Sequence, residues 1–198
     1  MNRDLSKIRI NLEKAVVLLV DENASGLDLL HSIVSGFGAG ERLRASSAHE
    51  AMDIVKARNV DLILVEAQLS KMDGYDFVHW LRRSGLKPNA FAPTILVTGH
   101  TPRGKVENAR DCGANYIVTK PLTPLVLLER IVFVSRDRPF VESASYVGPD
   151  RRYKNQGPPI GGLGRRRTDL QDELGDAMAP NMSQSEIDAL LKPTKVRT

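Results

Sequence analysis

Five short apolar runs, separated by segments with helical spacing, constrain the fold of this chain more than any other feature. The runs are AVVLLV (15–20), RLRAS (42–46), DLILV (61–65), TILVT (94–98) and NYIVT (115–119). Near-continuous apolar runs are typical of parallel strands covered on both faces. The intervening segments carry apolar residues at helical spacing, and the helix expected around 104–112 is the least clearly patterned. This alternation predicts an α/β fold, a doubly wound five-stranded parallel sheet with helices on both faces.

Bulk properties agree with an ordinary globular domain and exclude several other classes. The chain has 198 residues, of which 41% are hydrophobic and 26% charged. No apolar run approaches the roughly 20 residues of a membrane span, and the N-terminus lacks the pattern of a secretory signal. The single cysteine rules out an internal disulfide. We therefore expect a cytoplasmic protein without a membrane span. No nucleophile–base pair or cofactor loop is evident, so we do not expect an enzyme.

Charged and polar side chains follow four of the five runs. They are Asp21, Glu22, Glu66, Thr98 and Lys120. In a sheet with strand order 2-1-3-4-5, the carboxyl ends of these four strands open onto one crevice. An acidic cluster with a single lysine is either a divalent-cation site or a charge cluster bridged by the lysine.

These landmarks resemble the receiver domain of bacterial response regulators, the CheY-like form of the flavodoxin-like fold. Met72-Asp73-Gly74 after Glu66, and Pro121 after Lys120, add to the resemblance. It covers residues 15–134 and leaves residues 1–14 as an N-terminal extension. It implies two-component phosphorelay signalling, a phosphoacceptor carboxylate, bound Mg²⁺, and a phosphoryl group clasped by Thr98 and Lys120.

The resemblance also exposes departures from the family pattern. The phosphoacceptor position holds Glu66 rather than aspartate, and Ile117 stands where a switch aromatic is expected, one residue after Tyr116. By resemblance, the candidate Mg²⁺ ligands are Glu22, Glu66 and Gln68. One extra methylene moves the carboxylate, and a misplacement of about 1 Å can cost on the order of a hundredfold in rate. Glu66 is therefore interpreted as a permanent mimic of the phosphorylated state or as an inert charge paired with Lys120. A charge cluster without any signalling role is the third hypothesis.

The composition changes after the fifth helical segment. Residues 135–181 are rich in Gly, Pro and Arg and lack a hydrophobic period, which predicts a largely disordered basic tail. Five arginines in two clusters are candidate nucleotide or anion contacts: Arg151, Arg152, Arg165, Arg166 and Arg167. Guanidinium groups bind phosphates, and similar extensions on CheY-like domains suggest a cyclic dinucleotide as ligand. A solvated tether and an anionic protein surface are alternatives, whereas nucleic acid is the least favoured partner.

The last patterned segment, MSQSEIDALLK (182–192), predicts a short amphipathic helix. Ser183 and Glu186 have capping-box spacing. Three apolar residues form a candidate anchor row for a partner groove: Ile187, Leu190 and Leu191. Glu186 and Asp188 add charges for a basic rim. The segment resembles the peptide by which the flagellar motor switch protein captures CheY. It could bind in cis or in trans, or be a generic amphipathic tail.

Together these features favour a stand-alone pseudo-receiver adaptor that acts by protein–protein interaction without phosphorylation. Chemotaxis or flagellar motility is the expected setting. A histidine kinase, another receiver or a flagellar component is the expected partner. Two alternatives remain, a cyclic-dinucleotide effector acting through the tail and a conventional phosphorylated response regulator.

Overall fold

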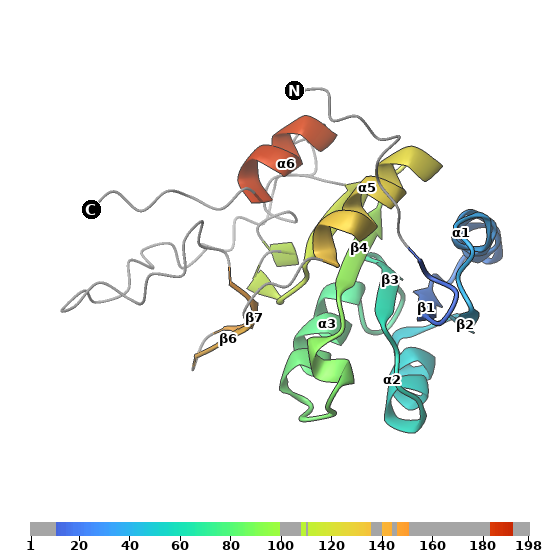
Figure 1. Ribbon diagram of the computed structural model, residues 1–198. Coiled ribbons are helices and arrows are strands. Elements are labelled where there is room, and N and C mark those ends of the chain that lie inside the picture. The colour runs from blue at the N-terminus through green and yellow to red at the C-terminus, as the bar shows by residue number, and fades with distance from the viewer. Residues whose placement is uncertain are drawn as a thin grey trace.

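A parallel five-stranded sheet forms the centre of the computed structural model (Figure 1). The structure describes residues 11–99, 108–109, 111–135, 140–143, 146–150 and 183–191, with only the backbone of 189–191. The strands are β1 (Val16–Val20), β2 (Glu41–Ala45), β3 (Leu62–Glu66), β4 (Thr94–Thr98) and β5 (Tyr116–Thr119). They pair in the order β2-β1-β3-β4-β5, all in parallel. The predicted fold class and strand order are confirmed.

Each helix around this sheet begins at a polar side chain that accepts hydrogen bonds from otherwise unpaired backbone N–H groups. The helices are α1 (Ala24–Gly36), α2 (Ala48–Ala57), α3 (Gly74–Arg83) and α5 (Pro124–Val134), capped by Asn23, Ser47, Asp73 and Thr123 respectively. A 3-10 turn, η2 (Asn89–Phe91), precedes β4. The helix expected around 104–112 lies mostly outside the described residues, although residues 108, 109 and 111 are helical.

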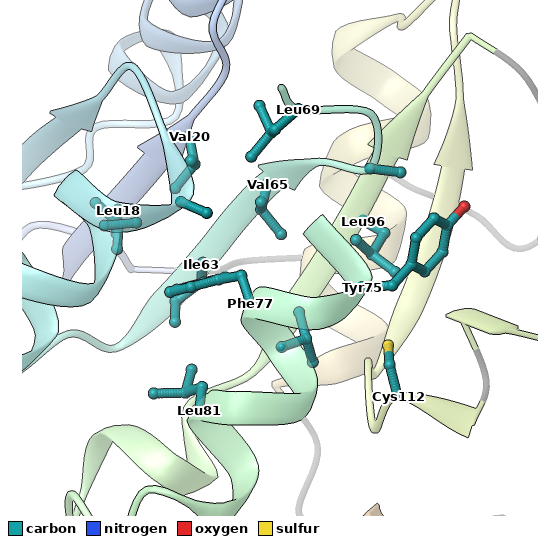
Figure 2. Close-up of a cluster of buried hydrophobic side chains, with 14 of the residues drawn as sticks. Leu18, Val20, Ile63, Val65, Leu69, Tyr75, Phe77, Leu81, Leu96 and Cys112 are labelled. Carbon is teal, nitrogen blue, oxygen red and sulfur yellow. The ribbon is translucent and has the colours of Figure 1, made fainter. Parts of the chain in front are cut away.

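Strand residues alternate between two buried layers, one on each face of the sheet. Leu18, Ile63 and Leu96 face α2 and α3 in one hydrophobic cluster (Figure 2). Their chain neighbours, such as Leu19 and Leu64, pack with α1 and α5 in the other. Burial on both faces explains why the strand sequences are almost continuously apolar. No helix in the described part of the chain is long and apolar enough to span a membrane.

Part of the segment expected to be disordered is ordered. Strands β6 (Phe140–Glu142) and β7 (Val147–Pro149) pair antiparallel, and β7 contacts α3. The expectation for 135–181 therefore fails for these residues. Strands of three residues are too short to show a hydrophobic period, and tertiary contacts hold them instead. The arginine clusters and the other residues of 151–182 lie outside the described part of the chain.

Arg82 of α3 connects this hairpin to the core around the five-stranded sheet. Its guanidinium is buried, with 4% exposure, and donates to the carbonyl oxygens of Gly113, Ala90 and Ala92. It also lies 5.2 Å from the ring centroid of Phe140 in β6. Burial lowers the pKa of Arg82 to about 10. The guanidinium remains charged at neutral pH. Its hydrogen bonds hold it within the core, and its cation–π contact with Phe140 joins the hairpin to that core.

Close backbone approach explains the glycine at position 113. Gly113 has a φ of +95°, and a Cβ there would lie 2.4 Å from the carbonyl oxygen of Val147 in β7. Any other residue would strain the backbone and push the hairpin away from the core.

Candidate functional site

Three charged side chains meet at the carboxyl edge of the sheet. The Lys120 Nζ atom, directly after β5, lies 2.6 Å from Glu66 Oε2 at the end of β3. The same nitrogen lies 3.1 Å from Asp21 Oδ2, directly after β1. Asp21 and Glu66 are buried, with 2% and 7% exposure, whereas the Lys120 side chain keeps 32%. Of the two arrangements left open by the sequence, the structure shows the one in which the lysine bridges the carboxylates.

Backbone groups hold both carboxylates in place. Asp21 Oδ1 accepts the N–H of Asn23 at 2.9 Å, and Glu66 Oε1 accepts the N–H of Gln68 at 3.1 Å. Gly74 allows the loop after β3 to close tightly, because a Cβ there would lie 2.3 Å from the Glu66 carbonyl oxygen. Each of the four carboxylate oxygen atoms thus has a hydrogen-bond or ion-pair partner, and both side chains are held beside Lys120.

The lysine is charged over a wide pH range. Burial opposes the charge, but hydrogen bonding to and attraction from Glu66, followed by those of Asp21, outweigh it and raise the pKa of Lys120. Burying a carboxylate costs free energy, because the charge loses its hydration. The Lys120 ammonium offsets this cost for both buried carboxylates.

Glu22, the second acid after β1, makes its contact with the loop after β3. Its Oε2 atom accepts the N–H of Ser70 at 2.8 Å, and hydrogen bonds from Ser70 lower the pKa of Glu22. Glu22 therefore ties the loop after β1 to the loop after β3.

The donor set as arranged does not fit the Mg²⁺ that the family resemblance implies. Of the predicted ligands, Glu66 is taken up by Lys120 and Gln68, and Glu22 by Ser70. Gln68 is exposed. The Lys120 ammonium occupies the point where the two buried carboxylates converge. Its positive charge would repel Mg²⁺ there. Among the described residues no group of three or more His, Cys, Asp or Glu side chains could hold a metal ion.

Thr98 and Ile117, the other two positions that the family resemblance singled out, lie in different surroundings. Thr98 is fully buried at the end of β4, and its carbonyl oxygen accepts the N–H of Lys120 at 2.8 Å. Ile117 is fully buried in the hydrophobic cluster on the α3 face of the sheet. Ile117 therefore contributes to packing, while Thr98 positions the Lys120 backbone.

The contacts of a second region, between the edge of the sheet and the C-terminal helix, were not predicted from the sequence. Tyr116, one residue before Ile117, donates its hydroxyl to Asp188 Oδ1 at 2.8 Å in α6 (Gln184–Leu191). Arg130 of α5 lies 2.6 Å from the other oxygen of Asp188. No local pattern marks Tyr116 or Arg130, because their partner lies 72 and 58 positions away in the sequence.

The predicted C-terminal helix is present, with its predicted capping box. Ser183 donates its N–H to Glu186 Oε2 at 2.8 Å, so Glu186 caps the helix instead of meeting a basic rim. Ile187 is fully buried. The side chains of the other two predicted anchors, Leu190 and Leu191, lie outside the described part of the structure.

Comparison with known proteins identifies the family. Residues 17–132 match the model of the response regulator receiver domain. The chain belongs to this family. The receiver resemblance inferred from the sequence is therefore confirmed, and with it a place in two-component signalling.

Individual relatives agree with this assignment. A transcriptional regulatory protein (YvrH) of Bacillus subtilis is 30% identical over 120 residues, which are 61% of this chain and 48% of that protein. The polar-differentiation response regulator DivK of Brucella ovis is 28% identical over 58% of this chain and 91% of its own length. Among solved structures, the chemotaxis protein CheY4 of Vibrio cholerae aligns with a TM-score of 0.56 and 26% identity, covering 61% of this chain and 98% of CheY4. The receiver core is thus the shared part, and the matched region spans about half of the Bacillus protein.

Proposed function

We propose that this receiver is a pseudo-receiver adaptor, which acts by protein–protein interaction and is not switched by phosphorylation. The observation that carries the proposal is the Lys120–Glu66 ion pair of 2.6 Å, with Asp21 as the second partner of the lysine. The glutamate carboxylate, one methylene longer than an aspartate, reaches the lysine directly. Because Glu66 already pairs with Lys120, the lysine needs no phosphoryl group as a partner.

Phosphorylation of Glu66 would disrupt this arrangement. The attacking carboxylate oxygen would have to leave Lys120 or Gln68, and both contacts are made at a buried position. Acidic residues would also have to bind a cation where an ammonium already lies. Because positioning dominates phosphoryl transfer, these costs favour a site that does not react.

The proposal has consequences for partners and setting. The chain would be non-catalytic and would work in the cytoplasm, with a histidine kinase, another receiver or a chemotaxis or flagellar component as partner. The chemotaxis protein CheY4 among the structural relatives and the helix-forming C-terminal segment support this setting.

A phosphohistidine-bearing donor protein tests the proposal. We expect incubation with the full chain and Mg²⁺ to leave the phosphoryl group on the donor. Glu66→Asp, which removes one methylene, is the matched variant and should accept more phosphoryl groups than the wild type. Stable transfer to Glu66 in the wild-type chain would favour the conventional response regulator instead.

A further inference from the structure

Helix α6 docks on the open edge of the sheet through three side chains on one side of the helix. Gln184, Ile187 and Asp188 stand at positions i, i+3 and i+4, the spacing that brings side chains to one face. In Figure 1, α6 (red) lies beside α5 at the end of the sheet where β5 is the outermost strand. The three side chains make three different kinds of contact.

Gln184 pairs with the backbone of the edge strand. The Thr119 N–H donates to Gln184 Oε1 at 2.9 Å, and Gln184 Nε2 donates to the Ile117 carbonyl oxygen at 3.3 Å. An edge strand presents unpaired N–H and C=O groups that another strand would normally satisfy. The side-chain amide of Gln184 satisfies one donor and one acceptor of β5 at once, as the backbone amide of a neighbouring strand would.

Asp188 meets a positive charge at the junction of β5 and α5. It accepts hydrogen bonds from Tyr116 Oη at 2.8 Å, Arg130 Nη2 at 2.6 Å and Gln184 Nε2 at 2.8 Å. The Arg130 guanidinium also lies 5.0 Å from the ring centroid of Tyr116. The Arg130 and Asp188 side chains keep only 17% and 24% exposure, so this charged contact is shielded from solvent.

Ile187 supplies the apolar contact. It is fully buried and belongs to the same hydrophobic cluster as Ile117, Cys112 and Tyr75. Among the α6 side chains that the structure describes, it is the only buried one. The receiver core therefore receives one aliphatic side chain from α6, and the remaining described contacts are polar.

We infer that Tyr116, Thr119 and Arg130 form a helix-docking site that α6 occupies in cis. We further infer that a partner helix carrying Gln, a large aliphatic residue and Asp at positions i, i+3 and i+4 takes the place of α6. An eight-residue helix is marginally stable alone, so α6 depends on these contacts to stay folded. Apart from Ile187, the described side-chain contacts of α6 are polar, and interfaces that form transiently are more polar than obligate ones. This inference rests on the proposed adaptor function, because it names the surface by which such an adaptor would select its partner.

A labelled peptide of residues 182–192 tests the exchange by fluorescence anisotropy with the full chain. The wild type should bind it weakly, because its own α6 occupies the site. Ile187→Asp within the chain should release α6 and strengthen peptide binding at least tenfold. Adding Arg130→Ala to that variant should abolish the gain, and a peptide with Ile187→Asp should not bind either.

A double variant, Gln184→Ala with Asp188→Asn, provides a second way to release α6 without placing a charge in the core. Far-ultraviolet circular dichroism reports whether each variant keeps the receiver fold. Equal affinity of the wild type and both released chains, or no binding to any of them, would overturn the inference. Because phosphoryl transfer is not measured, failure here leaves the proposed Glu66 chemistry intact, and transfer to Glu66 would leave the peptide result intact.

Discussion

The Lys120 ammonium lies 2.6 Å from the Glu66 carboxylate and 3.1 Å from that of Asp21, joining the ends of β5, β3 and β1. Glu66 and Asp21 come from strands that are neighbours in the sheet, whereas β5 is separated from β3 by β4. One lysine therefore connects the central strands to the edge strand next to α6.

Removing the lysine should destabilise the fold. Lys120→Met leaves two buried carboxylates without their counter-charge. Losing one partner of a fully buried pair costs roughly 3–5 kcal/mol. Because the Lys120 side chain is 32% exposed, we expect a smaller loss of about 1–3 kcal/mol. Urea denaturation measures it, and adding Glu66→Gln should recover part of the loss. An unchanged midpoint for Lys120→Met would show that the cluster is not a stabilising pair.

The same contact predicts a pH dependence at the alkaline end. The pKa of Lys120 is raised in the folded protein above its ordinary value of 10.5. A base with a raised folded-state pKa stabilises fully below its unfolded value and loses that contribution as pH rises through the folded value. On the alkaline side, the stability difference between wild type and Lys120→Met should therefore hold up to about pH 10 and shrink above it. Thermal unfolding of both proteins across this range measures the difference. A difference that does not shrink as the pH rises above 10.5 would contradict the assignment to Lys120.

The docking of the hairpin depends on Gly113. Gly113→Ala forces a side chain into a φ of +95° and into contact with the Val147 carbonyl oxygen. We expect a loss of about 1–3 kcal/mol and faster amide hydrogen exchange in 146–150. Gly36→Ala is the matched control, because a Cβ there meets nothing within 4 Å and the residue ends α1. Equal effects of the two substitutions would argue against a role for Gly113 in docking.

Local sequence patterns were sufficient for the sheet and for the charge cluster. Strands β3 and β4 are buried throughout and apolar except at terminal residues, so their positions follow from composition, and strand order brings their polar ends together. Asp21, Glu66 and Lys120 meet as this argument predicts. The contact of Glu22 with Ser70 could not be predicted, because it depends on the path of the loop after β3.

Contacts between distant segments explain what the sequence did not reveal. The hairpin has three-residue strands that contact α3, and the Phe140 ring of β6 lies against the guanidinium of Arg82, a residue type that is usually exposed. The docking of α6 depends on Gln184 matching the spacing of N–H and C=O groups on β5. Such matches are geometric, and neither partner shows a distinctive pattern in its own segment.

Intact-protein mass spectrometry after incubation with acetyl phosphate and Mg²⁺ shows whether Glu66 accepts a phosphoryl group, and it needs no partner protein. We expect the wild-type chain to keep its mass, while Glu66→Asp gains the mass of one phosphoryl group. A stable phosphoryl adduct that maps to Glu66 in the wild-type chain would contradict the account.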